Sequence, residues 1–214
     1  MDRSILTLLL WIIIAFLCGS LPFSVWIGQR VLKKDIRRYG DANPGATNVL
    51  RAGGRGAAAL ALILDFLKGA LPVALAHFQA HFTGWALVGV ALAPVLGHAF
   101  SPFLRFRGGK AVAVTVGIWC GLTVWEGPTV GGLLLGLFFL VLAVDGWAVI
   151  CAILGMLLYF CLTPSAWNGL AARPELTVIL AVGVGNLLIL AWKHRADLMR
   201  PLRLRPWLIR RLQL

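Results

Sequence analysis

The chain alternates long apolar segments with short polar connections. No Lys, Arg, Asp or Glu occurs from Ser4 to Gln29 or from Gly69 to Leu104, and a membrane-spanning helix needs about 20 apolar residues. Breaks in this pattern predict seven helices: Ile5–Gln29, Ala57–Ala76, Phe82–Ala99, Ala111–Trp125, Thr129–Val144, Trp147–Leu162 and Leu176–Trp192. The fourth and fifth are short, and are therefore tilted, re-entrant or joined differently.

Composition assigns the chain to the membrane proteins. Hydrophobic residues make up 60% of it and charged residues 13%, whereas about a quarter of residues are charged in soluble proteins. We predict an all-α, polytopic membrane bundle in which residues 1–214 form one domain. Met1–Cys18 resembles a signal peptide, but the apolar stretch runs on to Gly28 without a clear cleavage site, so we interpret it as a retained first span.

Two pairs of glycines in the predicted fourth and fifth helices have GxxxG spacing. They are Gly117 with Gly121 and Gly132 with Gly136. This spacing lets helix backbones approach closely, so we expect both pairs to mark helix–helix contacts.

The basic residues predict the orientation in the membrane. Seventeen of the 20 follow the first, third and seventh predicted spans, and therefore lie on one side. The positive-inside rule assigns that side to the cytoplasm, with the N-terminus outside and the C-terminus inside.

The net charge of +12 indicates an anionic partner. Basic residues beside a membrane set topology and attract anionic lipid headgroups, and most of Lys33–Arg38 and Arg200–Arg211 fits that explanation. No nucleic-acid-binding module is recognisable, so nucleic acid is not an expected partner. No obligate protein partner is indicated either.

Three polar clusters fall on the predicted cytoplasmic side, and their residue types suit phosphate. Asn43–Asn48 combines amide and hydroxyl donors with a Pro-Gly turn, and Arg51 follows with a planar guanidinium. Gly108-Gly109-Lys110 precedes an apolar helix, where backbone N–H groups and the helix N-terminus favour anions. The third cluster is Lys193–Asp197. Each cluster alone is equally compatible with a structural role.

Taken in order, the motifs resemble one family. The chain is similar over nearly its whole length to the bacterial acyl-phosphate-dependent glycerol-3-phosphate acyltransferases (the PlsY family). The matching pieces are Gly19–Phe23, Asp35–Arg37, Asn43–Arg51, Asp65 with Lys68-Gly69, Gly97-His98, Pro102–Phe106, Gly108–Lys110 and His194-Arg195.

The resemblance implies transfer of a fatty acyl group from acyl phosphate to glycerol 3-phosphate at the cytoplasmic face of a bacterial inner membrane. The products are lysophosphatidate and phosphate. Acyl phosphate is an activated anhydride, so neither a covalent nucleophile nor a cofactor or metal is expected. The four cysteines lie in apolar segments and are interpreted as small buried hydrophobic residues.

The resemblance also implies roles for individual residues. Substrate or phosphate contacts are expected from Asn43, Thr47, Asn48, Arg51, His98, Gly108, Gly109 and Lys110. Lys110 and His194 are the expected catalytic groups. His194 would orient the glycerol hydroxyl or accept its proton, although a substrate phosphate is an alternative base. His77 and His81 lie away from every motif and receive no role.

Asp65 and Lys68 lie inside a predicted span, where charges are costly. Their i, i+3 spacing places them on one helix face, so we expect a neutralising pair in preference to a catalytic one.

The chain departs from the family pattern at several positions of the expected site. The family usually has serine in place of Asp41, glycine in place of Ala111, and Glu-Asn in place of Ala196 and Asp197. An arginine and a serine usual near the start of the sixth span are missing around Gly146–Val149. A carboxylate at position 41 would repel phosphate unless paired, and we expect it to pair with Arg37, Arg38 or Arg51.

Two other functions fit the residues. Polar residues at span ends and a charged pair within a span also suit a small anion transporter, although transporters usually contain two related halves and no internal repeat is visible. A lapsed paralogue that binds lipid phosphate without turnover is the second alternative.

Overall fold

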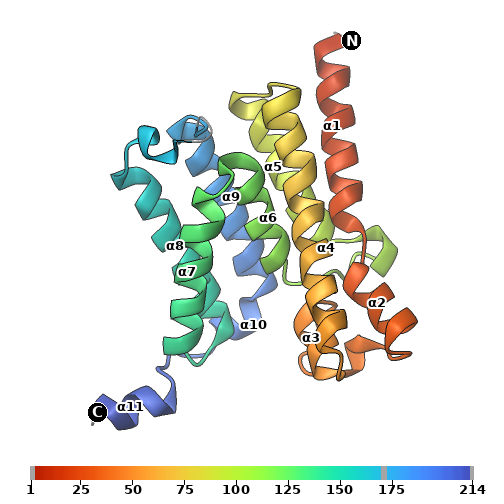
Figure 1. Ribbon diagram of the computed structural model, residues 1–214, viewed down its shortest axis with the longest axis vertical. Helices are drawn as coiled ribbons and strands as arrows, with labels where there is room; N and C mark the ends of the chain where they lie inside the picture. Colours follow the sequence, from red (N-terminus) through yellow and green to blue (C-terminus); the bar gives the residue numbers. More distant parts are fainter. Residues whose placement is uncertain (1–2, 170–172, 213–214) are drawn as a thin grey trace.

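The computed structural model describes residues 3–169 and 173–212, and their regular secondary structure is helical, apart from one isolated antiparallel bridge between Leu142 and Leu204 (Figure 1). The expected all-α class is confirmed. The α-helices are α1 (Arg3–Ser20), α2 (Phe23–Val31), α3 (Ala46–Arg51), α4 (Arg55–Ala74), α5 (Gly84–Ala99), α6 (Val112–Thr123), α7 (Glu126–Val141), α8 (Asp145–Leu162), α9 (Leu176–Lys193), α10 (Arg195–Leu198) and α11 (Pro206–Leu212). Short helical turns are η1 (Ile36–Arg38), η2 (Leu75–Gln79), η3 (Pro102–Leu104) and η4 (Ser165–Asn168).

Five segments of the described chain are long and apolar enough to cross a membrane. They are Ser4–Val31, Arg55–Gln79, Gly84–Leu104, Asp145–Leu162 and Leu176–Lys193. The predicted fourth and fifth segments exist as α6 and α7, with 12 and 16 residues. At 1.5 Å per residue these helices extend about 18 and 24 Å, less than the roughly 30 Å of a bilayer core.

The first predicted helix is not continuous. Ile5–Gln29 was expected as one helix, but α1 ends at Ser20 and α2 begins at Phe23. The break falls at Leu21-Pro22, because proline has no N–H to donate and disfavours helical geometry in the preceding residue. Nearby side chains satisfy the carbonyls at the break. Lys68 Nζ donates to the Leu21 carbonyl at 2.7 Å, and Ser101 Oγ donates to the Ser20 carbonyl at 2.6 Å.

The expected pair between Asp65 and Lys68 is confirmed. Lys68 Nζ lies 2.6 Å from Asp65 Oδ1, and both side chains are buried. Ser24 Oγ donates to Asp65 Oδ2 at 2.6 Å. The pair therefore fastens α4 to the broken helix α1–α2, and this structural role accounts for two charges within an apolar segment.

One of the two GxxxG pairs packs as predicted. A Cβ atom on Gly117 would lie 2.1 Å from the Phe66 carbonyl oxygen, and one on Gly121 would lie 2.8 Å from that of Ala70, so α6 meets α4 backbone to backbone. The prediction for Gly132 and Gly136 is wrong. Both lie on α7, and beyond the backbone of that helix no atom of the described chain comes within 4 Å of an added Cβ.

This contrast predicts a large effect of one methyl group on stability. Gly117→Ala should clearly lower the melting temperature in detergent, because the added Cβ would overlap the backbone of α4. Overpacking of this kind typically costs about 1–3 kcal/mol. Gly136→Ala is the matched control. It should leave the melting temperature unchanged or raise it slightly, because alanine is the better helix former by about 1 kcal/mol. Equal melting temperatures for the two variants would contradict the close contact between α4 and α6.

A buried polar cluster joins helices at the end of the bundle opposite the three polar clusters. Arg173 donates to Glu126 at the start of α7 and to the Thr163 carbonyl at the end of α8, and Asn168 Nδ2 also donates to Glu126 at 2.7 Å. The Glu126 side chain is fully buried. This cluster links the loop after α8 to the turn between α6 and α7. The Glu126 carboxylate is engaged in these structural contacts.

The four cysteines correct a further expectation. All are free thiols as predicted, but Cys18, Cys120 and Cys151 are only half-buried and Cys161 is exposed on the bundle surface. An apolar segment of a membrane protein has an outward face as apolar as its core, so burial cannot be inferred from the segment alone.

The three polar clusters meet at one end of the bundle (Figure 1). The loop between α2 and α4, the loop between α5 and α6, and the turn from α9 into α10 all lie at the lower end, whereas the N-terminal end of α1 lies at the upper end. The fold therefore brings together residues that are far apart in the chain.

Candidate active site

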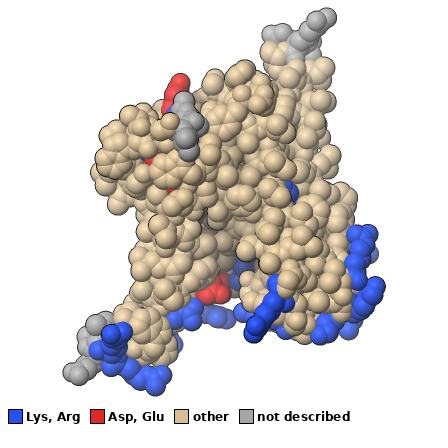
Figure 2. Space-filling model, in the orientation of Figure 1, with Lys and Arg blue, Asp and Glu red and all other residues tan. Residues whose placement is uncertain are grey.

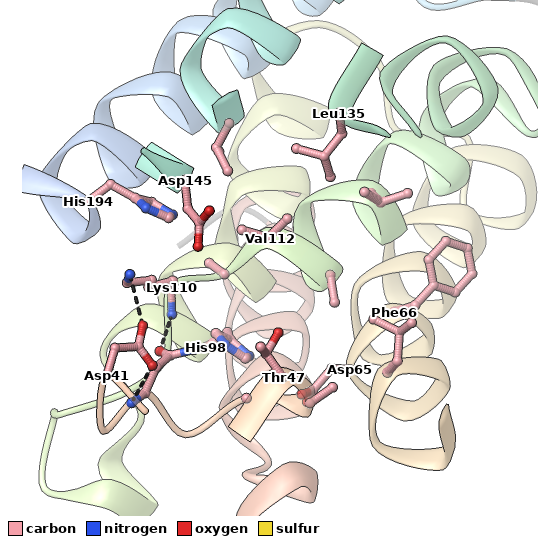
Figure 3. Close-up of a pocket in the computed structure, with 18 of the residues that line it drawn as sticks. Asp41, Thr47, Asp65, Phe66, His98, Lys110, Val112, Leu135, Asp145 and His194 are labelled. Carbon is pink, nitrogen blue, oxygen red and sulfur yellow. Dashed lines mark hydrogen bonds and ion pairs between the residues drawn. The ribbon is translucent and has the colours of Figure 1, made fainter. Parts of the chain in front are cut away.

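A cavity of about 560 Å³ opens among these three segments and extends between α4, α6 and α7. Six of the residues predicted for the site line it (Figure 3): Asn43, Thr47, Arg51, His98, Lys110 and His194. The cavity thus has side chains from all three polar clusters on its wall.

The first cluster forms a hydrogen-bonded loop that leads into α3. Asn48 is almost fully buried, and its Nδ2 donates to the Asn43 carbonyl at 2.9 Å and to Asp41 Oδ1 at 3.1 Å. Arg51 Nη1 donates to Asn48 Oδ1 at 3.1 Å. Asn48 does not line the cavity, so its visible contribution is to support Asn43, Asp41 and Arg51, which do.

The second cluster packs tightly against His98 at the end of α5. The N–H of Gly109 donates to the His98 carbonyl at 3.0 Å, and the N–H of Lys110 donates to Asn43 Oδ1 at 2.9 Å. An added Cβ would lie 2.0 Å from the His98 carbonyl oxygen at Gly108 and 2.3 Å from His98 Nε2 at Gly109. Close packing against His98 therefore explains why glycine occupies both positions. The N–H groups of Gly109 and Lys110 already donate hydrogen bonds within the protein. A contact of either glycine with phosphate stays a prediction.

Ala111, which caps the N-terminus of α6, has a left-handed backbone with φ of 63°. This conformation costs an L-residue roughly 1–2 kcal/mol, whereas glycine adopts it readily. The glycine usual in the family at this position is therefore the residue that the turn favours, and this chain carries strain there.

Lys110 is held between two carboxylates. Its Nζ lies 2.9 Å from Asp41 Oδ2 and 3.0 Å from Asp197 Oδ2, while Arg51 Nη1 lies 3.7 Å from Asp41 Oδ1. The expected pairing of Asp41 with an arginine is confirmed for Arg51, but Lys110 is the closer partner. The contact with Lys110 was not foreseen, because this lysine comes from another segment of the chain.

These contacts shift the ionisation of both partners. Burial disfavours the charged form of Asp41, but the contact with Lys110 and bonds from Asn43 and Asn48 outweigh it and hold the pKa of Asp41 below its usual value. Burial also acts against the Lys110 ammonium, and its bonds to Asp41 and Asp197 outweigh that effect and raise the pKa of Lys110. Against the effect of burial, Lys110 likewise holds the pKa of Asp197 below its usual value, so Asp41, Lys110 and Asp197 are all charged at neutral pH.

The third cluster places His194 at the end of α9, facing the cavity. Its side chain is only 2% exposed, and its Nδ1 lies 3.4 Å from Asp197 Oδ2. Its Nε2 has no hydrogen-bond partner within residues 3–169 and 173–212. Burial and the Lys110 charge lower the pKa of His194, against the opposite influence of Asp197 and Asp145, so the imidazole is neutral near pH 7.

Lys193 connects the third polar cluster to the second. Its Nζ donates to the carbonyls of Ala99 and Gly108, each at 2.9 Å. This lysine lies within the polar cluster noted in the sequence, but no substrate role was predicted for it. Its observed role is to dock the end of α9 against the loop that carries Lys110.

Asp145 is a cavity residue that the sequence analysis missed. It begins α8, lines the cavity, and lies beside His194 in Figure 3. None of the motifs that carry the family resemblance includes it, and its only signal in the sequence is its position between the predicted fifth and sixth helices.

Apart from Asp65 of α4, most of the remaining wall is apolar. It includes Leu62, Ile63 and Phe66 of α4, Val116 of α6, and Leu135 and Phe139 of α7. Figure 2 shows acidic side chains in a hollow at the lower end of the molecule, with Lys and Arg beside it and along the lower edge. One cavity therefore joins a charged end to a hydrocarbon-lined arm between helices.

Comparison with known proteins agrees with this arrangement. Residues 9–203 match the protein family described as "Glycerol-3-phosphate acyltransferase". "Glycerol-3-phosphate acyltransferase 1" of Thermotoga maritima is 36% identical over 204 residues, covering 90% of this chain and 96% of that protein. "Glycerol-3-phosphate acyltransferase" of Rubrobacter xylanophilus is 38% identical over 199 residues, covering 91% of each.

Solved structures give the same assignment. The crystal structure of PlsY (YgiH), an integral membrane glycerol 3-phosphate acyltransferase, in its glycerol 3-phosphate form superposes with a TM-score of 0.75 at 30% identity, covering 91% of both chains. Its lysophosphatidic acid form gives the same TM-score at 29% identity. The fold, the cavity and these relatives agree, and the chain belongs to the glycerol-3-phosphate acyltransferase family.

Proposed function

We propose that the protein transfers a fatty acyl group from acyl phosphate to glycerol 3-phosphate, giving 1-acyl-glycerol 3-phosphate (lysophosphatidate) and phosphate. The observation that carries the proposal is one cavity that joins a polar end, with Arg51 and Lys110 on its wall, to an apolar arm. The polar end suits two phosphates, and the arm between α4, α6 and α7 suits the acyl chain of a donor that enters from the membrane. Glycerol 3-phosphate and lysophosphatidic acid appear in the structures of the relative described above.

Each polar side chain has a role in this proposal. Arg51 and Lys110 bind phosphate through charge-assisted hydrogen bonds, which are stronger than neutral ones. Asn43 and Thr47 donate or accept bonds at the same end, where His98 also lines the cavity. Holding the acceptor hydroxyl against the acyl carbonyl supplies proximity and orientation, which are large terms when the donor is already activated.

The proposed chemistry is a direct acyl transfer. The acceptor oxygen attacks the acyl carbonyl carbon, a new C–O ester bond forms, and the bond between that carbon and the phosphate oxygen breaks. The hydroxyl proton passes to His194 Nε2, whose lone pair has no partner in the described chain and whose ring lines the cavity. The proton then leaves with the released phosphate, so the histidine is regenerated.

We further propose that the site faces the cytoplasm of a bacterial inner membrane. Seventeen of 20 basic residues lie towards the end that contains the cavity, which the positive-inside rule assigns to the cytoplasm. The N-terminus is then outside and the C-terminus inside. In this arrangement α6 and α7 count as two short spans, giving seven in total.

Product analysis tests this proposal against its rivals. Purified protein is incubated with labelled glycerol 3-phosphate and either a long-chain acyl phosphate or the matching acyl thioester, and the lipid products are identified by mass spectrometry. We expect lysophosphatidate from acyl phosphate only. Product from the thioester alone would overturn the proposed donor. Binding of glycerol 3-phosphate without any product from either donor would identify a lapsed paralogue.

A further inference from the structure

We propose that Asp197 is a positioning residue for the acyl transfer, which holds His194 with its Nε2 atom towards the acceptor hydroxyl and keeps Lys110 beside it. This inference rests on the proposed function. It concerns a residue for which neither the sequence analysis nor the family comparison supplied a role. Asp197 Oδ2 contacts both groups, at 3.4 Å from His194 Nδ1 and 3.0 Å from Lys110 Nζ.

The backbone around Asp197 is fixed from two sides. Its N–H donates to the His194 carbonyl at 2.8 Å within the turn that joins α9 to α10. Gly146 of α8 packs directly against this turn, because an added Cβ there would lie 2.7 Å from Asp197 Cβ and 3.3 Å from His194 Cβ. The carboxylate and the imidazole therefore keep their relative positions because α8 holds both of them.

This geometry selects one tautomer of His194. A charged carboxylate accepts hydrogen bonds only, so the nitrogen facing it carries the proton. That places the proton on Nδ1 and leaves the lone pair on Nε2, which has no partner in the described chain and belongs to a side chain that lines the cavity. The distance of 3.4 Å is long for a hydrogen bond, as is common for such contacts before substrate binds.

The same carboxylate restrains Lys110. With Asp41 on its other side, the ammonium is held by two anions and is less free to bind phosphate. Loss of the Asp197 charge should therefore allow the Lys110 ammonium to bind the substrate phosphate more freely. It should also allow the His194 ring to rotate. The proposal predicts opposite effects on turnover and on substrate affinity, which damage to the fold would not produce.

Three charged groups face His194 from the elements packed around it. They are Lys110 from the loop before α6, Asp145 at the start of α8, and Asp197 in α10. Lys110 favours the neutral imidazole, whereas the two carboxylates favour the charged one. Removing Asp197 therefore lowers the pKa of His194 further, and moves the loss of activity on acidification to lower pH.

The experiment compares Asp197→Ala, Asp197→Asn and Asp41→Asn with the wild type, measuring kcat and KM for glycerol 3-phosphate as a function of pH. Asp197→Ala should lower kcat at least about tenfold without raising KM, because positioning of the base is lost. Asp197→Asn should recover much of kcat, since its amide oxygen still accepts from Nδ1. Both should shift the acidic midpoint of kcat downward.

Asp41→Asn is the matched control. It also removes one carboxylate from Lys110, but Asp41 is not among the groups that face His194, so the acidic midpoint should stay at the wild-type value. A phosphate monoester also ionises near pH 6. The acidic midpoint of kcat is therefore attributed to His194 from its difference between the variants. Unchanged midpoints in both Asp197 variants, or a rise in KM together with the fall in kcat, would overturn the positioning role.

A spectroscopic readout keeps this inference separate from the proposed reaction. The protein has four histidines, and nitrogen-15 labelling of their rings, with His194 assigned from a His194→Gln variant, reports the tautomer directly. We expect the proton on Nδ1 in the wild type and a mixture of tautomers in Asp197→Ala. A proton on Nε2 of wild-type His194 would overturn the inference even if the acyl transfer is confirmed. The inference about the tautomer would stand if the wild type formed no lysophosphatidate.

Discussion

Replacement of His194 by glutamine should lower kcat by about 100-fold or more, the largest single effect that we expect in this protein. General bases contribute roughly 10²- to 10⁴-fold to proton transfer. Glutamine fills similar space at this almost fully buried position but cannot accept the hydroxyl proton. KM should change little, because the phosphate contacts proposed for Arg51 and Lys110 remain. Steady-state kinetics with acyl phosphate and glycerol 3-phosphate measure both parameters.

His77→Gln is the control for this substitution. His77 lies in η2, does not line the cavity, and receives no role in the reaction. Its substitution should leave kcat within about twofold of the wild type. A similarly small change for His194→Gln would show that a substrate phosphate accepts the proton, and would remove the base from the proposed mechanism.

Replacement of Lys110 by alanine should lower kcat/KM by roughly 30- to 150-fold. This corresponds to a loss of about 2–3 kcal/mol, the usual scale for a charge-assisted hydrogen bond at a partly buried site. The substitution also leaves Asp41 and Asp197 without their closest cation, so both carboxylates would face the incoming phosphate. We therefore expect KM for glycerol 3-phosphate to rise, and not kcat alone to fall.

Lys33→Ala provides a matched loss of charge. Lys33 is exposed at the same end of the chain's fold and does not line the cavity. It should leave kcat/KM unchanged within about twofold, while circular dichroism shows both variants to be helical. Normal kcat/KM in folded Lys110→Ala would contradict phosphate binding by this lysine.

Local patterns were enough to predict the helical class and that the three polar clusters would meet at one cavity. Apolar runs and flanking charges depend on neighbouring residues only, and they placed Asn43, Lys110 and His194 at one end of the bundle before any contact was known. The Asp65–Lys68 pair was predictable for the same reason, since its i, i+3 spacing lies within one helix.

Features that depend on contacts between distant segments were not predictable. The break at Pro22 was concealed because no charged residue interrupts Ile5–Gln29 on either side of it. Gly132 and Gly136 have the same spacing as Gly117 and Gly121, yet only the latter pair faces another helix closely. Whether a motif packs depends on which side of the helix the fold covers.

The carboxylates of the cavity show the same limit. Asp41 was expected to find an arginine nearby in the sequence, and it does contact Arg51, but its closest cation is Lys110 from the loop before α6. The proximity of Asp145 and Asp197 to His194 could be recognised only from the fold, which brings α8, α9 and α10 together. Departures from a family pattern therefore need the three-dimensional arrangement before they can be interpreted.

The most direct measurement of the central claim is release of phosphate from a long-chain acyl phosphate by the purified protein, followed together with formation of lysophosphatidate. The account predicts that phosphate appears only when glycerol 3-phosphate is present, and in equal amount to the lysophosphatidate formed. Phosphate release at the same rate without glycerol 3-phosphate, or lysophosphatidate formed without phosphate release, would contradict it.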